Sequence, residues 1–534
     1  MTDGRGSDRR LPLVVGLVGA AVTIVAAKWH LPGLGNDATS YVAIADRLAR
    51  HGELGYFLEH RLTLWPPGWP ATLAFFEWAF GIRPQITALT INALTMIVIA
   101  FEAWWLLRRL VRDDRIVAVG TIVATLGPAT VSQSYMVQTE TTFIALVLGS
   151  FIALIRFSDS RRWSWFGLAV LLQWFAFLDR YVGIVAIGAG ALWLLFESGT
   201  QTAMARVRNA IGFGLASAVV PGAWLLRNIS VTGDIGSAFG PRDTPTATYA
   251  RNLVDATTSV GQFIHGLSRY EPFTGILRLV SLALLALCGV IALALLARWI
   301  VDRRAASAPD PVSNASLARA AIGGPAGLLA IYAFAHWVYM IYSASTIAFD
   351  PVNTRYLAPM FIPALIASLT LVDRGRAGWG PLTPRLLSIG VGTLLVIQVG
   401  GGLVRVSASY WNDAASGYDA PQWQRALASP VLDQLPDDCE HVYSNFPEAT
   451  YLAHIEAQRS PRITKFASSD QLTELRDATR AVDRGEKSCL IWISPRVLAT
   501  PTYQHPLSDI RAEVDLVPVA RDRDVAVYVM APRA

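Results

Sequence analysis

The sequence predicts a polytopic α-helical membrane protein that ends in a small α/β domain. Of 534 residues, 53% are hydrophobic and 16% are charged, which is too apolar for a soluble protein of this length. The apolar residues are gathered into runs long enough to cross a bilayer. Beyond residue 405 the runs become short and rich in β-branched and aromatic residues, with helical stretches between them. We therefore expect about 11 transmembrane helices followed by a domain built around a sheet.

The expected spans follow one another with short connections. The segment 66–82 is also apolar, but its tandem prolines and Glu77 favour a re-entrant or interfacial helix over a crossing. The remaining runs are 11–28, 85–107, 116–132, 140–156, 163–178, 181–197, 209–227, 274–298, 320–342, 356–372 and 386–404.

Positive charge sets the expected orientation. If 66–82 does not cross, every arginine-rich short loop falls on one side of the membrane, which is the cytoplasmic side by the positive-inside rule. The net charge of +5 is then explained by topology and not by nucleic-acid binding. The loops contain Arg5, Arg9 and Arg10; Arg108, Arg109, Arg112 and Arg115; Arg156, Arg161 and Arg162; Arg206 and Arg208; Arg298, Arg303, Arg304 and Arg319; and Arg374, Arg376 and Arg385.

This orientation divides the chain into three parts in a plasma membrane. Residues 1–10 form a cytoplasmic N-terminus, and 11–405 form the membrane domain with an outer loop at 29–84. Residues 406–534 form an extracytoplasmic α/β domain. The first span is expected to be retained, because no small-residue cleavage site follows it.

Two acidic residues lie at the outer edge of apolar runs. Asp37 precedes an amphipathic helix, so it is either an N-cap or a partly desolvated carboxylate suited to act as a base. Glu140 opens the fourth span, where an ionised group either faces a polar cavity or is stabilised by the helix dipole. Both readings of each residue stay open.

Two arginines lie on the side where topology disfavours positive charge. Arg180 and Arg355 each suit the binding of an anionic group, because a guanidinium matches phosphate oxygens in planar geometry. The alternatives are an ion pair between Arg180 and the adjacent Asp179, and snorkelling of Arg355 to the interface.

The remaining reactive side chains favour structural roles. Cys439 and Cys489 each precede an expected strand of the C-terminal domain, so they form either a disulfide in an oxidising compartment or two small core residues. Cys288 lies in a span and is expected to pack there. His336 is expected to be a hydrogen-bonded packing residue and the one titratable side chain well inside a span. The Cys and His spacing matches no metal site.

Several of these residues together resemble a family. The order of a span, an outer insertion with an acidic start, a Trp-Pro-Pro-Gly motif and a Glu-Thr segment opening the fourth span is similar to the GT-C glycosyltransferases. The resemblance covers about residues 10 to 410 and is closest to protein mannosyltransferases, the lipid A aminoarabinose transferase and lipopolysaccharide galacturonosyltransferases. The matching positions are Asp37, Tyr41, Trp65-Pro66-Pro67-Gly68, Glu140, Arg180-Tyr181 and Arg355-Tyr356-Leu357-x-Pro359.

The resemblance implies transfer of a monosaccharide from a polyprenyl-phosphate donor to a cell-envelope acceptor at the outer face. Asp37 would be the base, Arg180 and Arg355 would bind the donor phosphate, and the substrate pocket would contain Tyr41, Trp65, Glu140, Tyr181 and Tyr356. Many relatives carry a paired acidic motif, whereas Asn36 precedes Asp37 here. No cofactor is therefore certain, and a divalent metal held by Asp37 and Glu140 stays an alternative.

Two other classes stay open. A lipid-linked polysaccharide polymerase or ligase would use a large later loop, and the outer segment 228–273 contains Arg242, Arg251, His265 and Arg269. A secondary transporter would show repeats and ionisable residues deep in the membrane. Within the outer loop, Tyr56, Phe57, Trp65 and Trp69 are expected at the level of the lipid headgroups.

Overall fold

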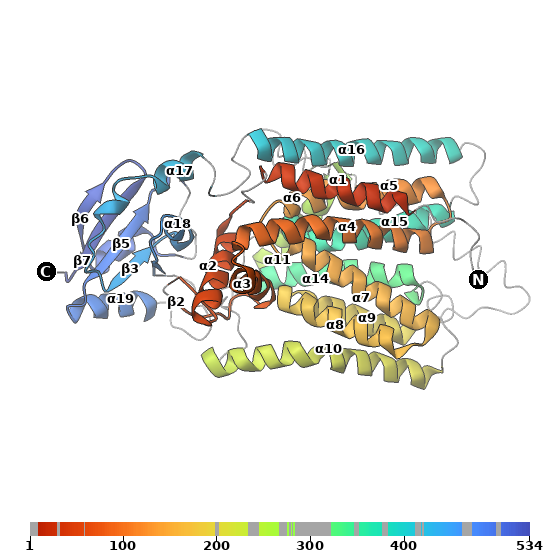
Figure 1. The fold of residues 1–534 in the computed structure, drawn as a ribbon, viewed down its shortest axis with the longest axis horizontal. Helices are drawn as coiled ribbons and strands as arrows, with labels where there is room; N and C mark the ends of the chain where they lie inside the picture. Colours follow the sequence, from red (N-terminus) through yellow and green to blue (C-terminus); the bar gives the residue numbers. More distant parts are fainter. Residues whose placement is uncertain are drawn as a thin grey trace, which may run out of the picture.

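The computed structural model describes most of the chain. The described residues are 9–28, 33–57, 59–197, 202–232, 245–265, 275–276, 279, 281–283, 322–346, 352–375, 383–411, 418, 421–461, 473–497 and 504–533. They form a bundle of long helices with a separate sheet at one end (Figure 1).

The bundle accounts for ten of the eleven expected spans; the expected span 274–298 lies almost entirely outside the described residues. Six of its helical segments are long and apolar enough to cross a membrane by themselves, and four shorter apolar helices pack among them. The helices are α1 Arg10–Ala26, α4 Pro84–Leu110, α5 Asp114–Leu126, α6 Pro128–Ser134, α7 Glu140–Ser160, α8 Trp163–Asp179, α9 Gly183–Phe196, α10 Ala203–Thr232, α14 Pro325–Thr346, α15 Thr354–Gly375 and α16 Thr383–Trp411.

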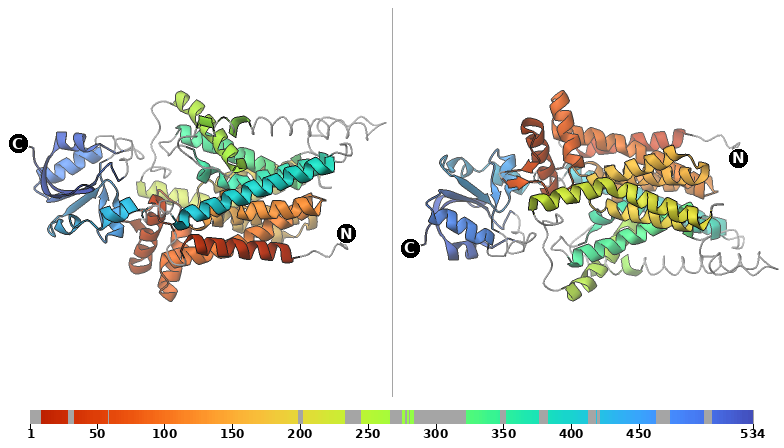
Figure 2. Two further views of the ribbon diagram at one scale, coloured as in Figure 1. Left: turned by 90° about the horizontal axis from the view of Figure 1, so that it is seen from above. Right: turned by 90° about the horizontal axis from the view of Figure 1, so that it is seen from below.

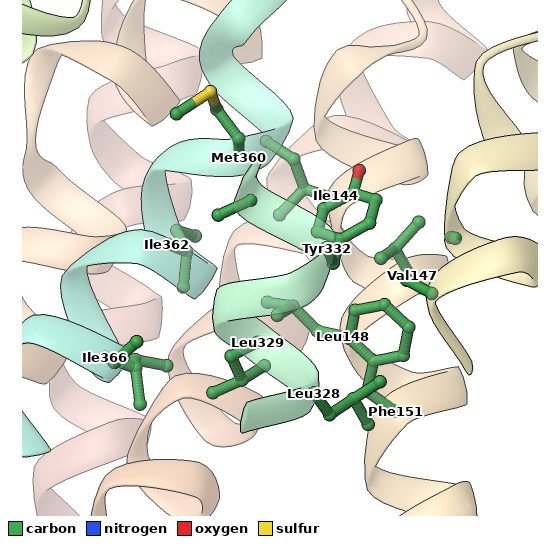
Figure 3. Close-up of a cluster of buried hydrophobic side chains, with 14 of the residues drawn as sticks. Ile144, Val147, Leu148, Phe151, Leu328, Leu329, Tyr332, Met360, Ile362 and Ile366 are labelled. Atoms are coloured by element: carbon green, nitrogen blue, oxygen red, sulfur yellow. The ribbon is translucent and has the colours of Figure 1, made fainter. Parts of the chain in front are cut away.

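The centre of the bundle is a close-packed apolar core. Phe151 of α7 meets Tyr332 of α14 edge to face, with ring centroids 5.2 Å apart, and branched side chains of α14 and α15 fill the space beside them (Figure 3). The core fixes the relative positions of the helices whose ends carry the candidate residues.

One expected loop is helical. The segment 228–273 contains the last turn of α10 and a further helix, α11 Pro245–His265, which packs against α14, α15 and α16. The expectation that 228–273 is a loop was wrong at α11. This helix has one polar and one apolar face, so its average hydropathy is too low for a membrane span. Arg251 pairs with Asp255 on the same helix, whereas Arg242 and Arg269 lie outside the described residues.

Two helices and a small hairpin cross the end of the bundle. We call α2 Asn36–His51, β1 Gly55–Tyr56, β2 Glu59–Arg61 and α3 Gly68–Phe80 the platform. Figures 1 and 2 show α2 and α3 turned across the bundle axis, between the bundle and the sheet. The segment 66–82 therefore does not join the bundle as a twelfth parallel helix.

The glycine of the Trp-Pro-Pro-Gly segment allows the platform to touch the bundle. A Cβ atom on Gly68 would lie 2.6 Å from the carbonyl oxygen of Leu178, at the end of α8. Real Cβ atoms do not approach that closely, so this contact requires glycine.

The C-terminal domain is a five-stranded mixed sheet in the order β4-β3-β5-β7-β6. β3 His441–Ser444 runs parallel to β4 Gln458–Arg459 and β5 Ser488–Ile493, and β7 Val525–Ala531 runs antiparallel to β5 and to β6 Asp515–Arg521. Its helical elements are α17 Pro421–Leu427, η3 Leu432–Gln434, α18 Pro447–Leu452, α19 Thr473–Asp483 and α20 Leu507–Glu513.

A disulfide joins two neighbouring strand segments of this sheet domain. Cys439 and Cys489 are bonded, with Cα atoms 5.9 Å apart. Cys489 is in β5 beside Val442 of β3, so the bond ties the start of β3 to β5. The domain boundary placed between residues 405 and 406 falls inside α16, which continues to Trp411.

The C-terminal domain shares a hydrophobic core with the platform. Buried side chains of α2 and α3 pack with those of α17, α18 and β5 in one cluster. The hydroxyl of Tyr451 donates a hydrogen bond to Asp46 of α2, and the amide of Tyr418 donates one to the carbonyl of Leu34, 2.8 Å away. The domain is therefore attached to the segment that leads directly into Asp37.

Candidate active site

Four candidate residues meet where the platform covers the bundle. Asp37 lies in the first turn of α2, Glu140 begins α7, Arg180 follows the last residue of α8, and Arg355 lies in the first turn of α15. Both carboxylates therefore lie at helix N-termini, where the backbone dipole favours negative charge.

Arg355 bridges the two acids. Its Nη2 donates to Oδ2 of Asp37 at 2.6 Å, and its Nε donates to Oε1 of Glu140 at 2.6 Å. Arg180 also donates to Glu140, and its Nη1 donates to the Thr139 hydroxyl at 2.9 Å. Two positive and two negative side chains thus form one network of charge-assisted hydrogen bonds.

The two carboxylates differ in access. The side chain of Glu140 is 0% exposed, whereas that of Asp37 is 28% exposed. Glu140 is therefore suited to hold the two arginines in place, since a buried charge requires a partner. Asp37 is suited to meet a molecule from outside the protein.

The structure decides two alternatives that the sequence left open. Arg180 pairs with Glu140 and not with the adjacent Asp179, whose buried Oδ2 atom has no hydrogen-bond partner. Arg355 is held by two carboxylates across the site and does not simply extend toward the interface.

Aromatic side chains line the site next to the charges. Tyr41, one turn after Asp37, is buried and meets Trp65 edge to face, with ring centroids 5.9 Å apart. Burial raises the pKa of the Tyr41 hydroxyl, with the nearby Asp37 charge acting in the same direction, so this group stays protonated. The guanidinium of Arg355 lies over the ring of Tyr356, 5.6 Å from its centre.

Tyr181 connects the platform to the bundle. Its hydroxyl donates to the carbonyl of Thr63 at 2.7 Å and accepts from Nε1 of Trp224 at 3.0 Å and from Nδ2 of Asn228 at 3.2 Å. The position of Tyr181 in the site was predicted, but this junction was not. Arg227 strengthens it by donating to the carbonyl of Leu62.

Trp224, Arg227 and Asn228 were missed by the sequence reasoning. The sequence feature that could have identified them is the segment WLLRN at 224–228. It is the polar end of an apolar run, on the side of the membrane where the positive-inside rule disfavours arginine. The same rule identified Arg180 and Arg355, and it applied equally to Arg227.

Two aromatic residues of the outer loop anchor the platform. Phe57 and Trp69 are buried in the core that the platform shares with the C-terminal domain. The exposed aromatics are Phe75, Trp78 and Phe80 of α3. α3 is apolar on all sides, so the sequence does not show which face is buried. The side chain of Tyr56 lies outside the described residues.

The titratable groups inside the bundle include one that was overlooked. His336 is buried and hydrogen-bonded, with Nε2 2.9 Å from the carbonyl of Tyr356 and Nδ1 3.2 Å from the Tyr332 hydroxyl, as expected of a packing residue. Glu102 of α4 also lies within a span, and its buried Oε2 atom has no hydrogen-bond partner. The statement that His336 is alone was therefore wrong.

The acids do not form a metal site of three or more ligands. Among the described residues, no group of three or more His, Cys, Asp and Glu side chains could hold a metal ion. The two acids considered for a metal, Asp37 and Glu140, share the guanidinium of Arg355 as their common partner.

Comparisons with known proteins identify the architecture. Residues 65–224 match the family model described as dolichyl-phosphate-mannose-protein mannosyltransferase. The chain is similar to crystal structures of ArnT from Cupriavidus metallidurans, in the apo state (13% identity, TM-score 0.57) and bound to undecaprenyl phosphate (12%, 0.54), with 97% of each chain covered. It is also similar to the archaeal oligosaccharyltransferase AglB from Archaeoglobus fulgidus in complex with an inhibitory peptide and a dolichol-phosphate.

The AglB match has 12% identity and a TM-score of 0.53, and covers 95% of this chain and 72% of that one. Comparison with curated proteins gives no match. At these identities, the structural likeness shows the fold of the chain.

Proposed function

We propose, from the GT-C glycosyltransferase fold that this chain has, that it transfers a monosaccharide from a polyprenyl-phosphate-linked donor to a glycan, lipid or protein of the cell envelope. The matched family model is named for a dolichyl-phosphate-sugar reaction, and two similar structures hold undecaprenyl phosphate and dolichol-phosphate. These relatives support a polyprenyl carrier for this chain as well.

The observation that carries the proposal is the pairing of a partly exposed carboxylate with two arginines in one cluster. An acceptor hydroxyl attacks the anomeric carbon of the donor, and its proton passes to Asp37. The bond between that carbon and the phosphate oxygen breaks, and the phosphate leaves with the electron pair. Arg180 and Arg355 stabilise the charge that develops on the leaving phosphate.

The base must be released before it can act. In this structure Nη2 of Arg355 donates to Oδ2 of Asp37 at 2.6 Å, so this oxygen is occupied by the guanidinium and not by an acceptor hydroxyl. A donor phosphate adds negative charge to a cluster that is formally neutral and competes with Asp37 for the guanidinium. Donor binding would therefore free Asp37 for the acceptor, while Glu140 keeps both arginines in the site.

The proposed orientation places this chemistry at the outer face. The platform and the C-terminal domain lie at one end of the bundle, and the described arginine-rich turns after α4 and α7 lie at the other (Figure 1). By the positive-inside rule the second end is cytoplasmic. A cysteine introduced at position 60 should react with an impermeant reagent added from outside, and one at position 112 should not; the reverse pattern would overturn the orientation.

The test is sugar transfer by the purified protein in nanodiscs. Radiolabelled polyprenyl-phosphate monosaccharides are supplied one at a time, with cell-envelope extract as a mixed acceptor. The parent is compared with Asp37→Asn and with the control Asp114→Asn, a side chain that is 73% exposed at the other end of the bundle. We expect one donor to be turned over by the parent and the control but not by Asp37→Asn.

Two results would contradict the proposal. An active, folded Asp37→Asn protein would remove Asp37 as the base. A folded parent that uses none of the monosaccharide donors but turns over an oligosaccharide-lipid would instead indicate a polymerase or ligase.

A further inference from the structure

A cavity lies in the platform, away from the cluster around Asp37. It has a volume of about 420 Å³ and is lined by Ala49, Arg50, Glu77, Trp78, Gly81 and Arg83. Arg50 is in the last turn of α2, whereas Asp37 is in the first. Since a helix rises about 1.5 Å per residue, the two sites are separated by roughly 20 Å along α2.

The charges of this cavity are incompletely paired. Nη2 of Arg50 is 3.6 Å from Oε1 of Glu77, which is too long for a hydrogen bond. The Oε2 atom of Glu77 is buried without a hydrogen-bond partner, although its side chain lines the cavity. Arg83, at the start of α4, is exposed. The cavity therefore offers two guanidinium groups and the carboxyl group of Glu77.

A second carboxylate lies behind Glu77. Asp46 accepts the hydroxyl of Tyr451, and its carboxylate also interacts with the carboxyl group of Glu77. Burial, together with the charge of Asp46, raises the pKa of Glu77 to about 7. A positively charged donor in the cavity would favour the ionised form of Glu77.

The rim of the cavity is apolar and aromatic. Trp78 is 72% exposed, and Phe75, Phe80 and Ile82 are exposed beside it. Because α3 lies across the end of a transmembrane bundle (Figure 2), these side chains are at the level where aromatic residues meet the membrane-water interface. The occupant is therefore expected to come from the bilayer.

We propose that this cavity binds the headgroup of an amine-bearing zwitterionic phospholipid of the phosphatidylethanolamine type. Its ammonium group donates to Glu77, and its phosphate lies between Arg50 and Arg83. An anionic lipid such as phosphatidylglycerol would bring a negative phosphate near Glu77 and Asp46. It has no ammonium group that could pair with these carboxylates. A choline headgroup has no N–H with which to satisfy Glu77.

The proposal is independent of sugar transfer and is tested by lipid retention. Native mass spectrometry of the detergent-purified full chain measures retention of phosphatidylethanolamine, phosphatidylcholine and phosphatidylglycerol with identical acyl chains. We expect the parent to retain phosphatidylethanolamine roughly tenfold more than either other lipid, as expected of one charge-assisted hydrogen bond. Glu77→Gln should remove this preference, whereas Arg83→Gln should lower retention of phosphatidylethanolamine because a phosphate contact is lost.

The matched control is Arg162→Gln, which removes an exposed arginine next to an exposed tryptophan, Trp163, at the other end of the bundle. It should retain the parent's preference. Equal retention of the three lipids by the parent, a preference for phosphatidylglycerol, an unchanged preference in Glu77→Gln, or unchanged retention in Arg83→Gln would overturn the proposal. Because Arg83 is exposed, its variant is expected to fold, and melting temperatures of all proteins check this.

Discussion

The two ends of the helix bundle contain the same kinds of charged residue in opposite arrangements. At the end with the arginine-rich turns, Arg108 pairs with Asp114 six residues away, and Arg109 pairs with Asp159 at the surface. At the platform end, Arg355 pairs with Asp37 and Glu140, which are 318 and 215 residues distant. The two pairs Arg108–Asp114 and Arg109–Asp159 are exposed, whereas the network at the platform end is mostly buried.

The difference indicates different reasons for the charges. Exposed ion pairs stabilise a protein by about 0–1 kcal/mol, so those at the first end are suited to solvation and topology. Burying charges costs free energy that their mutual attraction only partly offsets. A buried network assembled from four distant segments therefore favours a role in ligand binding or chemistry over a role in stability.

The largest expected effect comes from removing the shared buried charge. Glu140→Gln leaves Arg180 and Arg355 close together with less compensation, and we expect it to lower the free energy of unfolding by about 3–5 kcal/mol. Asp159→Asn should change it by less than about 1 kcal/mol. Thermal unfolding in the same detergent measures both, and equal effects would remove the distinction between the two ends.

Arginine substitutions test the proposed donor contact. Arg355→Ala should raise the concentration of donor needed for half-maximal transfer by about 10- to 100-fold, because a charge-assisted hydrogen bond to phosphate is lost. Arg108→Ala, at the other end, should leave it unchanged. Transfer rates measured over a range of donor concentrations separate this from simple instability, which would lower the maximal rate alone. An unchanged donor dependence for Arg355→Ala would argue against a phosphate contact.

A backbone contact sharpens the comparison at the platform. In Gly68→Ala, the new methyl group would lie 2.6 Å from the Leu178 carbonyl oxygen, so α3 must shift, at an expected cost of about 1–3 kcal/mol and with reduced transfer. Gly167→Ala on the same helix as Leu178 meets nothing within 4 Å and is the control. Unfolding and activity measurements on both report whether the Trp-Pro-Pro-Gly segment holds the site in place.

The candidate residues could be predicted because each breaks a local rule. Asp37, Glu140, Arg180 and Arg355 are charges at the platform ends of apolar runs, and such charges are costly unless they have a purpose. The fold class followed from hydropathy in the same way, since span length and charge bias are properties of continuous segments.

The pairing of these residues could not be predicted from the sequence. Asp179 and Arg180 are neighbours in the chain, but Asp179 ends a helix and Arg180 is extended, with φ −150° and ψ 133°. Their side chains therefore diverge, and Arg180 reaches Glu140 instead. Glu102 was overlooked for a related reason: a hydropathy window averages one carboxylate among many apolar side chains, and only packing shows that its Oε2 has no partner.

The smallest expected effect concerns two glutamates at the same end of the bundle. Glu140 has hydrogen bonds from two arginines, whereas Glu77 has one arginine at 3.6 Å and a carboxylate beside it. The pKa of Glu77 is raised to about 7 in the folded protein, so the folded state binds this proton more tightly than the unfolded state does. Stability should therefore decline as the pH rises from about 4.5, the ordinary pKa of a glutamate, through 7.

Glu77→Gln cannot titrate and should flatten this part of the stability profile in lipid-free detergent. Adding phosphatidylethanolamine to the parent should flatten it as well, because the ammonium group supplies the cation that Glu77 lacks. A parent profile that is already flat without lipid would mean that Arg50 alone satisfies Glu77. Glu140 and Glu77 would then differ in the geometry of their arginine contacts, but neither glutamate would need a ligand to pair its charge.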